Sequence, residues 1–410
     1  MSRSSLRRKA DYTAFSDQMT AEEGTAAPED DRRPQEPALS QDESPFVRIA
    51  LDAMGGDFAP AAIVDGAMEA AAEHSDIRII LVGVEDVVKT ELARHDNVPD
   101  SISVVHADEV IAMDEQPAAA LRRKKNSSVH VGIKMVRDGE ADAFISAGNT
   151  GAVMTVATVL LRTIELIDRP AIAATMPSQR GYMILLDAGA NVVCKPENLF
   201  QFGIMGSIFA EHSLDKPRPT VGLLSIGEED VKGNPTTKEA FDFFSRSSLN
   251  FIGNIEAKLF YRGIVDVVVC DGFTGNIALK ISESVAEMIG VFLKQMFSAN
   301  LATKIAYFLM KSHLAAFKKK VDHQEVGGAP LLGVNGPVFI CHGSSSPKSI
   351  KSAVIRARKF VREKVIDHIK ENLAENKDIL AHKEGKDEGI WTQITRKIGF
   401  GHQQEEKKDE

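Results

Sequence analysis

The chain has 410 residues, of which 43% are hydrophobic and 26% charged, the composition of a globular protein with a sizeable core. Its formal net charge of -9 argues against a general nucleic-acid binder, because phosphate backbones select basic surfaces. The three cysteines lack paired spacing, and no run of about 18 apolar residues occurs, so we expect reduced thiols in a cytosolic protein without a membrane-spanning helix.

Two polar segments flank the middle of the chain. Residues 1–46 are rich in Pro, Asp, Glu, Gln and Ser, so we expect a disordered N-terminal extension that cannot bury enough apolar surface to fold. Its first residues lack the apolar stretch of a secretory signal. Residues 376–410 are again dominated by charge and are expected to form a solvated C-terminal tail. The folded domain is therefore expected over residues 47–375.

Between these ends, short β-branched runs alternate with helical patterns. The runs are apolar on both faces, which favours a buried, largely parallel sheet. Helical patterns follow most of them, so the alternation predicts a doubly wound, layered α/β fold. The predicted strands cover residues 47–52, 77–83, 102–107, 141–147, 183–188, 220–227, 250–253 and 265–271, with a further one at PVFIC before residue 342.

Several predicted strands end in a polar, glycine-containing turn before a helix. These turns are DAMGGD (52–57), SAGNTG (146–151), DAGAN (187–191) and DGFTGN (271–276). Ligands of open α/β sheets bind beyond the carboxyl ends of strands, where helix N-termini attract anions. Each glycine alone can simply turn the chain. Four such turns with hydrogen-bond donors favour a convergent anion site, whereas no nucleotide-binding motif follows any strand.

Three other polar clusters interrupt the apolar pattern. RRKKNSS (122–128) places cations beside a helix start, where a solvated helix end is the alternative interpretation. GEEDVKGN (227–234) is an expected loop, and CHGSSS (341–346) follows a strand and precedes a helix, so it is a further anion-ready turn. No HExxH motif and no His/Cys cluster offers metal-ligand spacing, and we therefore expect no metal.

Residues 300–320 form an amphipathic pattern with apolar residues on one helical stripe and lysines elsewhere. Such a helix is suited to a membrane interface, with its lysines toward lipid phosphate. A helix that faces the core or a dimer partner is the alternative. The apolar stripe contains Leu301, Ile305, Phe308 and Leu309.

Together these segments resemble the bacterial phosphate acyltransferase family, the phosphate:acyl-acyl-carrier-protein acyltransferases that begin phospholipid synthesis. The resemblance runs from about Val47 to Ile366, essentially the whole expected domain. Residues 1–46 and the long tail depart from the family pattern at its two ends. The matching motifs are IALDAMGGD, HADEVI, RRKKNSS, SAGNTGA, LLDAGAN, KPENL, the GEED–KGN loop, FIGNIEA, DGFTGN and HGSS.

The resemblance implies a three-layer α/β/α fold like that of phosphotransacetylase and isopropylmalate dehydrogenase. It also implies a homodimer without a cofactor that takes its acyl group from acyl carrier protein. Such an enzyme works at the inner face of the cytoplasmic membrane and hands acyl phosphate to a membrane glycerol-3-phosphate acyltransferase. The resemblance also favours the interpretation that residues 300–320 contact a membrane.

Residue types at the predicted strand ends then suggest individual roles. Lys195 is expected to neutralise phosphate or polarise the thioester carbonyl, Asn234 to stabilise the oxyanion, and His342 to carry a proton. Asp187 and Asp271 are expected to orient these groups, because a free carboxylate repels phosphate. The expected substrate-binding residues are Gly55, Gly56, Asp57, Asn149, Thr150, Gly151, Asn191, Thr274, Gly275, Asn276, Gly343, Ser344 and Ser345. The acidic carrier protein is expected to dock on Arg122, Arg123, Lys124 and Lys125.

The expected reaction is direct attack of phosphate on a thioester, with no covalent enzyme intermediate. Three alternatives stay open. One is a phosphate acetyl- or butyryltransferase that uses coenzyme A esters, and another is a membrane-associated scaffold for lipid-synthesis enzymes. The third, a dehydrogenase of the related architecture, lacks a dinucleotide fingerprint.

Overall fold

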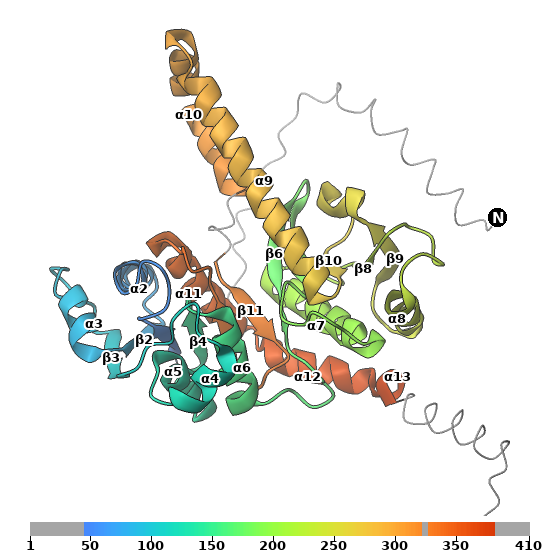
Figure 1. Ribbon diagram of the computed structural model, residues 1–410, viewed down its shortest axis with the longest axis horizontal. Coiled ribbons are helices and arrows are strands. Elements are labelled where there is room, and N and C mark those ends of the chain that lie inside the picture. The colour runs from blue at the N-terminus through green and yellow to red at the C-terminus, as the bar shows by residue number, and fades with distance from the viewer. Residues whose placement is uncertain (1–44, 322–326, 382–410) are drawn as a thin grey trace, which may run out of the picture. The chain divides into compact units, whose positions relative to one another are not determined.

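The computed structural model describes residues 45–321 and 327–381. These residues form two β-sheets flanked by helices (Figure 1). The strand order is β3-β2-β1-β4-β12-β11-β5 in the seven-stranded sheet and β6-β7-β10-β8-β9 in the five-stranded sheet. Both sheets are mostly parallel, and the predicted α/β class is confirmed, but the strands that the sequence placed in one sheet are divided between two.

The seven-stranded sheet is covered by helices on both faces. Residues alternate along β1, so that Ile49 and Leu51 belong to the hydrophobic core under α2 and α11, whereas Ala50 packs on the side of α5 and α6. The strands are β1 (Val47–Asp52), β2 (Ile77–Gly83), β3 (Ile102–His106), β4 (Ala143–Ser146), β5 (Ala171–Ile172), β11 (Ala329–Leu332) and β12 (Val338–Ile340). The helices are α2 (Ala61–Glu73), α3 (Glu85–Leu92), α4 (Pro117–Arg123), α5 (Ser128–Arg137), α6 (Thr150–Leu161) and α11 (Pro347–Arg362).

The five-stranded sheet packs against the long buried helix α7. Gly203 lets α7 approach Phe244 of α8, and the rings of Phe200 and Phe244 meet edge to face with centroids 5.4 Å apart. The strands are β6 (Ala174–Ser178), β7 (Gly181–Leu186), β8 (Val221–Ser225), β9 (Phe251–Glu256) and β10 (Val267–Val269). The helical elements are α7 (Pro196–Leu214), α8 (Pro235–Arg246), the 3-10 helix η1 (Ala257–Arg262), α12 (Val365–Glu375) and α13 (Lys377–Ala381).

The chain passes from one sheet to the other within a single residue, Ala173, which separates β5 from β6. Contacts on both sides hold this junction. The Arg356 side chain of α11 donates to Thr175 Oγ1 at 2.8 Å, and α12 packs against α7. Strands β5, β6 and β11 are absent from the sequence prediction because β5 has only two residues and β6 and β11 contain proline. Pro177 is tolerated because β6 is an edge strand.

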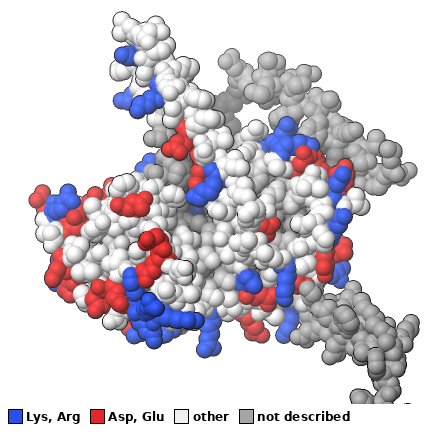
Figure 2. Space-filling model, viewed as in Figure 1, with Lys and Arg blue, Asp and Glu red and all other residues white. Residues whose placement is uncertain are grey.

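Helices α9 (Gly272–Ser298) and α10 (Leu301–Val321) form a hairpin, the helical arm, that extends away from the sheets (Figure 1). At the turn of the hairpin, Asn300 Oδ1 accepts from the Thr303 N–H at 3.0 Å. Helix α10 spans nearly the segment in which the sequence predicted an amphipathic helix. Much of the arm's surface carries neither acidic nor basic residues (Figure 2). Within the part of the chain that the structure covers, no helix is long and apolar enough to cross a membrane.

The two predicted polar ends lie mostly outside the described residues. Only residues 45–46 of the predicted N-terminal extension are described. The predicted tail begins with Asn376 and α13, and Ile379 and Leu380 of that helix pack against the main core. The ordered C-terminal part therefore reaches at least Ala381.

Candidate active site

The glycine turns follow the carboxyl ends of strands, three in each sheet. We name residues 52–57, 146–151 and 341–346 of the seven-stranded sheet the Asp52 loops. We name residues 187–195, 226–234 and 270–276 of the five-stranded sheet the Asp187 loops. Because β1, β4 and β12 run parallel, the Asp52 loops lie at one edge of their sheet, and the same holds for β7, β10 and β8.

A buried carboxylate holds the Asp52 loops together. The Ser146 hydroxyl donates to Asp52 Oδ2 at 2.7 Å, and the Met54 N–H donates to Asp52 Oδ1 at 3.1 Å. Gly55 is required beside them, because a Cβ at that position would lie 2.4 Å from Asp52 Oδ2. The Asp57 N–H donates to the Gly343 carbonyl at 2.8 Å, which joins the first and last of these loops.

Burial raises the pKa of Asp52 above its ordinary value, because the charged carboxylate is removed from water. Hydrogen bonds from the hydroxyls of Ser128 and Ser146 and from backbone N–H groups oppose this shift without cancelling it. Two of the partners are hydroxyls, which are able to donate or accept.

Asn149 caps α6 and is committed to the fold. Its Oδ1 accepts from the Ala152 N–H at 3.0 Å, and its Nδ2 donates to the carbonyls of Ala112, Met113 and Glu115 at 3.2, 3.0 and 2.9 Å. The side chain has no donor left for a ligand. A phosphate contact at this predicted site residue therefore has to come from the backbone of the α6 N-terminus, where Thr150 is exposed and Gly151 half-buried.

His342 is exposed at the end of β12 and bonded within its own turn. Ser344 Oγ lies 2.7 Å from His342 Nδ1, and the Ser344 backbone N–H donates to the same nitrogen at 3.3 Å. We therefore assign Nδ1 as the unprotonated nitrogen and place the proton on Nε2. Gly343 lies against the Asp57 carboxylate, and Ser345 is buried below the turn.

The Asp187 loops are organised by a second buried carboxylate. Asp187 Oδ1 accepts from the N–H groups of Ile172, Gly189 and Ala190 at 3.1, 3.1 and 3.0 Å. Asp187 Oδ2 accepts from the Asn191 N–H at 2.7 Å and from Asn191 Nδ2 at 2.9 Å. Asp187 thus fixes the DAGAN turn, and its bond to Ile172 of β5 ties that turn to the seven-stranded sheet.

The loops that follow β7 and β10 fit closely together. A Cβ on Gly275 would lie 1.8 Å from the Asp187 carbonyl oxygen, so only glycine permits α9 to begin here. The Gly272 N–H donates to the Asn191 carbonyl at 2.7 Å. Asn191, predicted to bind substrate, is buried and also donates to the Pro170 carbonyl at 2.8 Å, so its side chain serves the fold.

Burial also shifts the titration of Asp187 and of two nearby thiols. Burial raises the pKa of Asp187, and the hydrogen bonds from residues 172, 190 and 191 oppose that rise. Burial raises the pKa of Cys194 to about 12, with a further contribution from the negative charge of Asp187. The pKa of Cys270 is raised by burial in the same way. Both thiols are therefore protonated near neutral pH and do not serve as nucleophiles.

Other polar groups of the Asp187 loops face solvent. Lys195 is exposed at the N-terminus of α7, and its ammonium group makes no hydrogen bond or ion pair with any described residue. Asn234 caps α8 through Oδ1, which accepts from the Thr237 N–H at 2.9 Å. Asn276 is exposed on the first turn of α9, next to Gly189. Three helix N-termini thus bring a cation and amide groups to one sheet edge.

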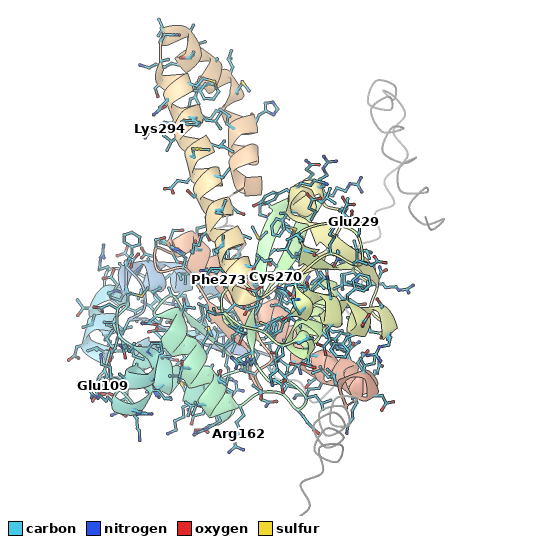
Figure 3. The ribbon with its side chains drawn as sticks, turned by 45° about the vertical axis from the view of Figure 1, so that its right-hand side comes forward. Glu109, Arg162, Glu229, Cys270, Phe273 and Lys294 are labelled. Atoms are coloured by element: carbon cyan, nitrogen blue, oxygen red, sulfur yellow. The ribbon has the colours of Figure 1, made fainter. Side chains whose placement is uncertain are left out.

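Asp271 and Thr274 complete the start of α9. The Asp271 carboxylate accepts from the Thr274 N–H and from the Thr274 hydroxyl, both at 2.8 Å. Thr274 is therefore engaged in the cap of its own helix. The base of α9 is visible in Figure 3, where Phe273 lies next to Cys270.

The basic residues at the end of α4 and just after it differ in their contacts. Arg122, Arg123 and Lys125 are exposed, and Figure 2 shows basic residues gathered over α4 and α5. Lys124 instead donates to Glu115 Oε2 and to the Val110 carbonyl, both at 2.6 Å. Sequence reasoning missed Glu115, which joins this segment to the Asp52 loops because Asn149 donates to its carbonyl. Nothing in the sequence pattern signals this contact.

We find no cluster of three or more His, Cys, Asp or Glu side chains able to hold a metal within residues 45–321 and 327–381. Two carboxylates at the strand ends, Asp52 and Asp187, already accept hydrogen bonds from their own loops. The groups left at the surface include the Lys195 ammonium and the Asn276 amide, which suit an anionic or carbonyl-bearing ligand, beside the exposed carboxylates of Asp57, Glu229 and Asp230.

Comparison with known proteins agrees with this chemistry. The family described as "Fatty acid synthesis protein" matches residues 47–368. The phosphate acyltransferase of Alkaliphilus oremlandii is 47% identical over 328 residues, which is 80% of this chain and 98% of that protein. The phosphate acyltransferase of Pelotomaculum thermopropionicum is 48% identical over 327 residues, 80% of this chain and 95% of that protein.

Among solved structures, a phosphotransacetylase from Streptococcus pyogenes matches with a TM-score of 0.54 and 18% identity, covering 78% of this chain and 94% of that one. That likeness defines the fold as the layered α/β architecture of phosphotransacetylases. The fold and the relatives together define an acyltransferase. The chain belongs to the bacterial phosphate acyltransferase family, as its sequence motifs predicted.

Proposed function

We propose that the protein transfers a fatty acyl group from acyl carrier protein to inorganic phosphate, yielding acyl phosphate for phospholipid synthesis. The observation that carries the proposal is the exposed Lys195 ammonium, which has no partner among the described residues and stands at the N-terminus of α7. This arrangement is suited to an anion and to a carbonyl that gains negative charge. The names of the relatives supply the acyl group and the phosphate acceptor.

In the proposed reaction, a phosphate oxygen attacks the thioester carbonyl carbon. A C–O bond forms, the C–S bond breaks, and the proton of hydrogen phosphate ends on the leaving thiol. Lys195 and Asn234 stabilise the developing oxyanion, an effect worth ~3 kcal/mol per donor in related sites. Holding both substrates in line lowers the barrier further, by up to ~7–11 kcal/mol in well-oriented reactions. His342 carries the proton.

The phosphate is proposed to bind at the turns Gly55–Asp57, Thr150–Gly151, Thr274–Asn276 and Gly343–Ser345, which lie before or at helix starts. The N–H groups of Asp57, Thr274 and Ser344 already donate within the fold, so the proposal relies most on the N-terminus of α6 at Thr150 and Gly151. Asn149 and Asn191 contribute by shaping their turns, because their side chains are occupied.

The exposed cations Arg122, Arg123 and Lys125 are proposed to receive the acidic carrier protein. Lys124 contributes indirectly, since its ion pair with Glu115 fixes the segment. Support comes from the contacts of Glu115, which pairs with Lys124 and accepts from Asn149 of the Asp52 loops at 2.9 Å, so the proposed docking residues connect to the proposed phosphate turns.

The apolar side chains of α10 are proposed to contact the inner face of the cytoplasmic membrane. Leu301, Phe308 and Leu309 are each about three-quarters exposed, and Ile305 is more than half exposed. Lys304 and Lys311 on the same helix are exposed and suited to anionic lipid. A homodimer at this surface would release acyl phosphate near a membrane glycerol-3-phosphate acyltransferase.

The test is phosphate-dependent release of carrier thiol from palmitoyl-acyl carrier protein, run beside palmitoyl-coenzyme A. Release from the carrier with formation of palmitoyl phosphate is the expected result. Release from coenzyme A alone would instead identify a phosphotransacylase of the same fold. No release from either donor would leave the scaffold interpretation.

A further inference from the structure

The Asp187 loops expose large apolar side chains beside their polar groups. Val192, Val193, Ile226, Val231 and Phe273 are between 58% and 80% exposed. Single exposed hydrophobic residues are ordinary on protein surfaces. These five, however, all belong to the loops that carry Lys195, Asn234 and Asn276, and none is needed to turn the chain.

The topology brings these side chains to one edge of the five-stranded sheet. Strand β10 lies between β7 and β8 and pairs in parallel with both. Val192 and Val193 follow β7, Phe273 follows β10, and Ile226 follows β8. Neighbouring strands are about 4.8 Å apart, so the three loops are adjacent, with Phe273 in the middle at the base of α9 (Figure 3).

We call these five exposed side chains the apolar rim. Apolar side chains beside a cation and amide donors fit an amphipathic ligand better than a purely polar one. Small charged ligands such as phosphate gain nothing from exposed valine and isoleucine side chains, whereas an alkyl chain gains by removing them from water. Exposed apolar side chains gathered at one sheet edge beside polar groups are typical of a binding surface. A hydrocarbon chain attached to a carbonyl satisfies both halves of the arrangement.

We propose that Val192, Val193, Ile226, Val231 and Phe273 form a binding site for the alkyl chain of the acyl donor. The inference rests on the proposed function and adds the residues that select long chains. The carbonyl lies at Lys195 and Asn234, and the chain leaves it across the apolar rim toward α9, where the exposed Ile277 continues the apolar surface.

The test compares a Val193→Ser and Ile226→Ser double variant with wild type. The matched control is Val159→Ser, because Val159 is 54% exposed on α6 of the seven-stranded sheet. Two readouts are measured: kcat/KM for palmitoyl- and acetyl-acyl carrier protein, and the Kd for cis-parinaric acid, a fluorescent fatty acid. The double variant is expected to lower the palmitoyl-to-acetyl ratio of kcat/KM by about tenfold and to weaken fatty-acid binding comparably.

The inference is overturned if wild type transfers acyl groups to phosphate but the double variant keeps the ratio and the Kd of the control. It is also overturned if the double variant only converts a dimer to a monomer in sedimentation, since a second copy would then cover the rim. If wild type binds the fatty acid through these residues but transfers nothing to phosphate, the apolar site stands and the proposed function fails.

Discussion

The Asp52 loops and the Asp187 loops use the same structural device to different ends. In each, a fully buried aspartate at the end of a parallel strand gathers hydrogen-bond donors from a glycine turn, and burial raises its pKa. In the Asp52 loops, the side-chain amide of Asn149 donates its hydrogen bonds to neighbouring backbone carbonyls. Around Asp187, Lys195 and Asn276 stay exposed.

In both sets of loops the buried aspartate shapes the turn, whereas the exposed residues decide which ligand the turn suits. The Asp52 loops offer His342 and the N-terminus of α6, a surface suited to phosphate, beside the exposed carboxylate of Asp57. The Asp187 loops add a cation and an apolar rim, a surface suited to an acyl thioester. The two sets are linked where Asp187 bonds to Ile172 of the seven-stranded sheet.

The largest expected effect comes from removing the two aspartates. Asp187→Ala leaves four backbone N–H groups, two of them buried and two half-buried, without their acceptor, which should lower the free energy of unfolding by at least ~3 kcal/mol. Asp52→Ala should cost less, about 1–2 kcal/mol, because its hydroxyl partners can turn to other acceptors. Urea denaturation measures both. Equal losses would contradict the distinction between the two loops.

Asparagine variants test the same difference in stability between the two aspartate sites. Asp52→Asn should stay within about 1 kcal/mol of wild type, because the hydroxyls of Ser128 and Ser146 can accept from the new amide. Asp187→Asn should lose about 2–3 kcal/mol, because every partner is a donor and the amide nitrogen would face N–H groups. A stable Asp187→Asn protein beside an unstable Asp52→Asn protein would refute the assigned roles.

Lys195→Ala should lower the rate of acyl transfer more than about tenfold without loss of folding, since it removes one electrostatic contact to the reacting groups. Steady-state kinetics and thermal unfolding are measured together. Lys377→Ala, an exposed lysine on α13, is the control. Near-normal turnover in Lys195→Ala would remove Lys195 from the reaction.

A smaller effect on activity is expected from removing the exposed arginines at the end of α4. Arg122→Ala with Arg123→Ala should raise KM for acyl carrier protein several-fold and weaken its dependence on salt, because fewer charges attract the carrier. Lys124→Ala serves as the contrast, since its partner is Glu115 and not solvent. If Lys124→Ala alone raised KM while the arginine variants did not, docking would lie elsewhere.

The smallest expected effect concerns the thiols. Because the pKa of Cys194 and of Cys341 is raised to about 12, both remain protonated from pH 7 to pH 9, and a reactive thiolate forms only near the raised value. N-ethylmaleimide should therefore leave activity unchanged. It should label the native protein slowly, and mass spectrometry measures the extent of labelling. Rapid labelling of Cys194 with loss of activity would bring this thiol into the reaction.

Local pattern predicted much of the fold and part of the candidate site. The strands at 47–52 and 77–83 were predicted with their observed bounds, because continuous apolar runs leave little ambiguity. The turns after the strands were found because glycine and donors recur there. The division into two sheets was missed, since it depends on the single-residue passage at Ala173 and on proline-containing strands without periodicity.

Side-chain roles were harder to predict because they depend on partners distant in sequence. Asn149 and Asn191 looked like ligand donors, yet their amides bond to the carbonyls of Glu115 and Pro170. Lys124 and Lys125 are adjacent in sequence, but only Lys124 meets a carboxylate. Residue type thus located the loops. Only the tertiary contacts distinguished exposed side chains from those that are hydrogen-bonded to other parts of the chain.

The central step of the proposed reaction is attack of a phosphate oxygen on the carbonyl carbon of the acyl group. Its most direct test uses phosphate labelled with ¹⁸O at all its oxygens, palmitoyl-acyl carrier protein, and mass spectrometry of the product. The expected product is palmitoyl phosphate in which all the phosphate oxygens, including the bridging one, carry the label. An unlabelled bridging oxygen, or free palmitate in place of acyl phosphate, would contradict it.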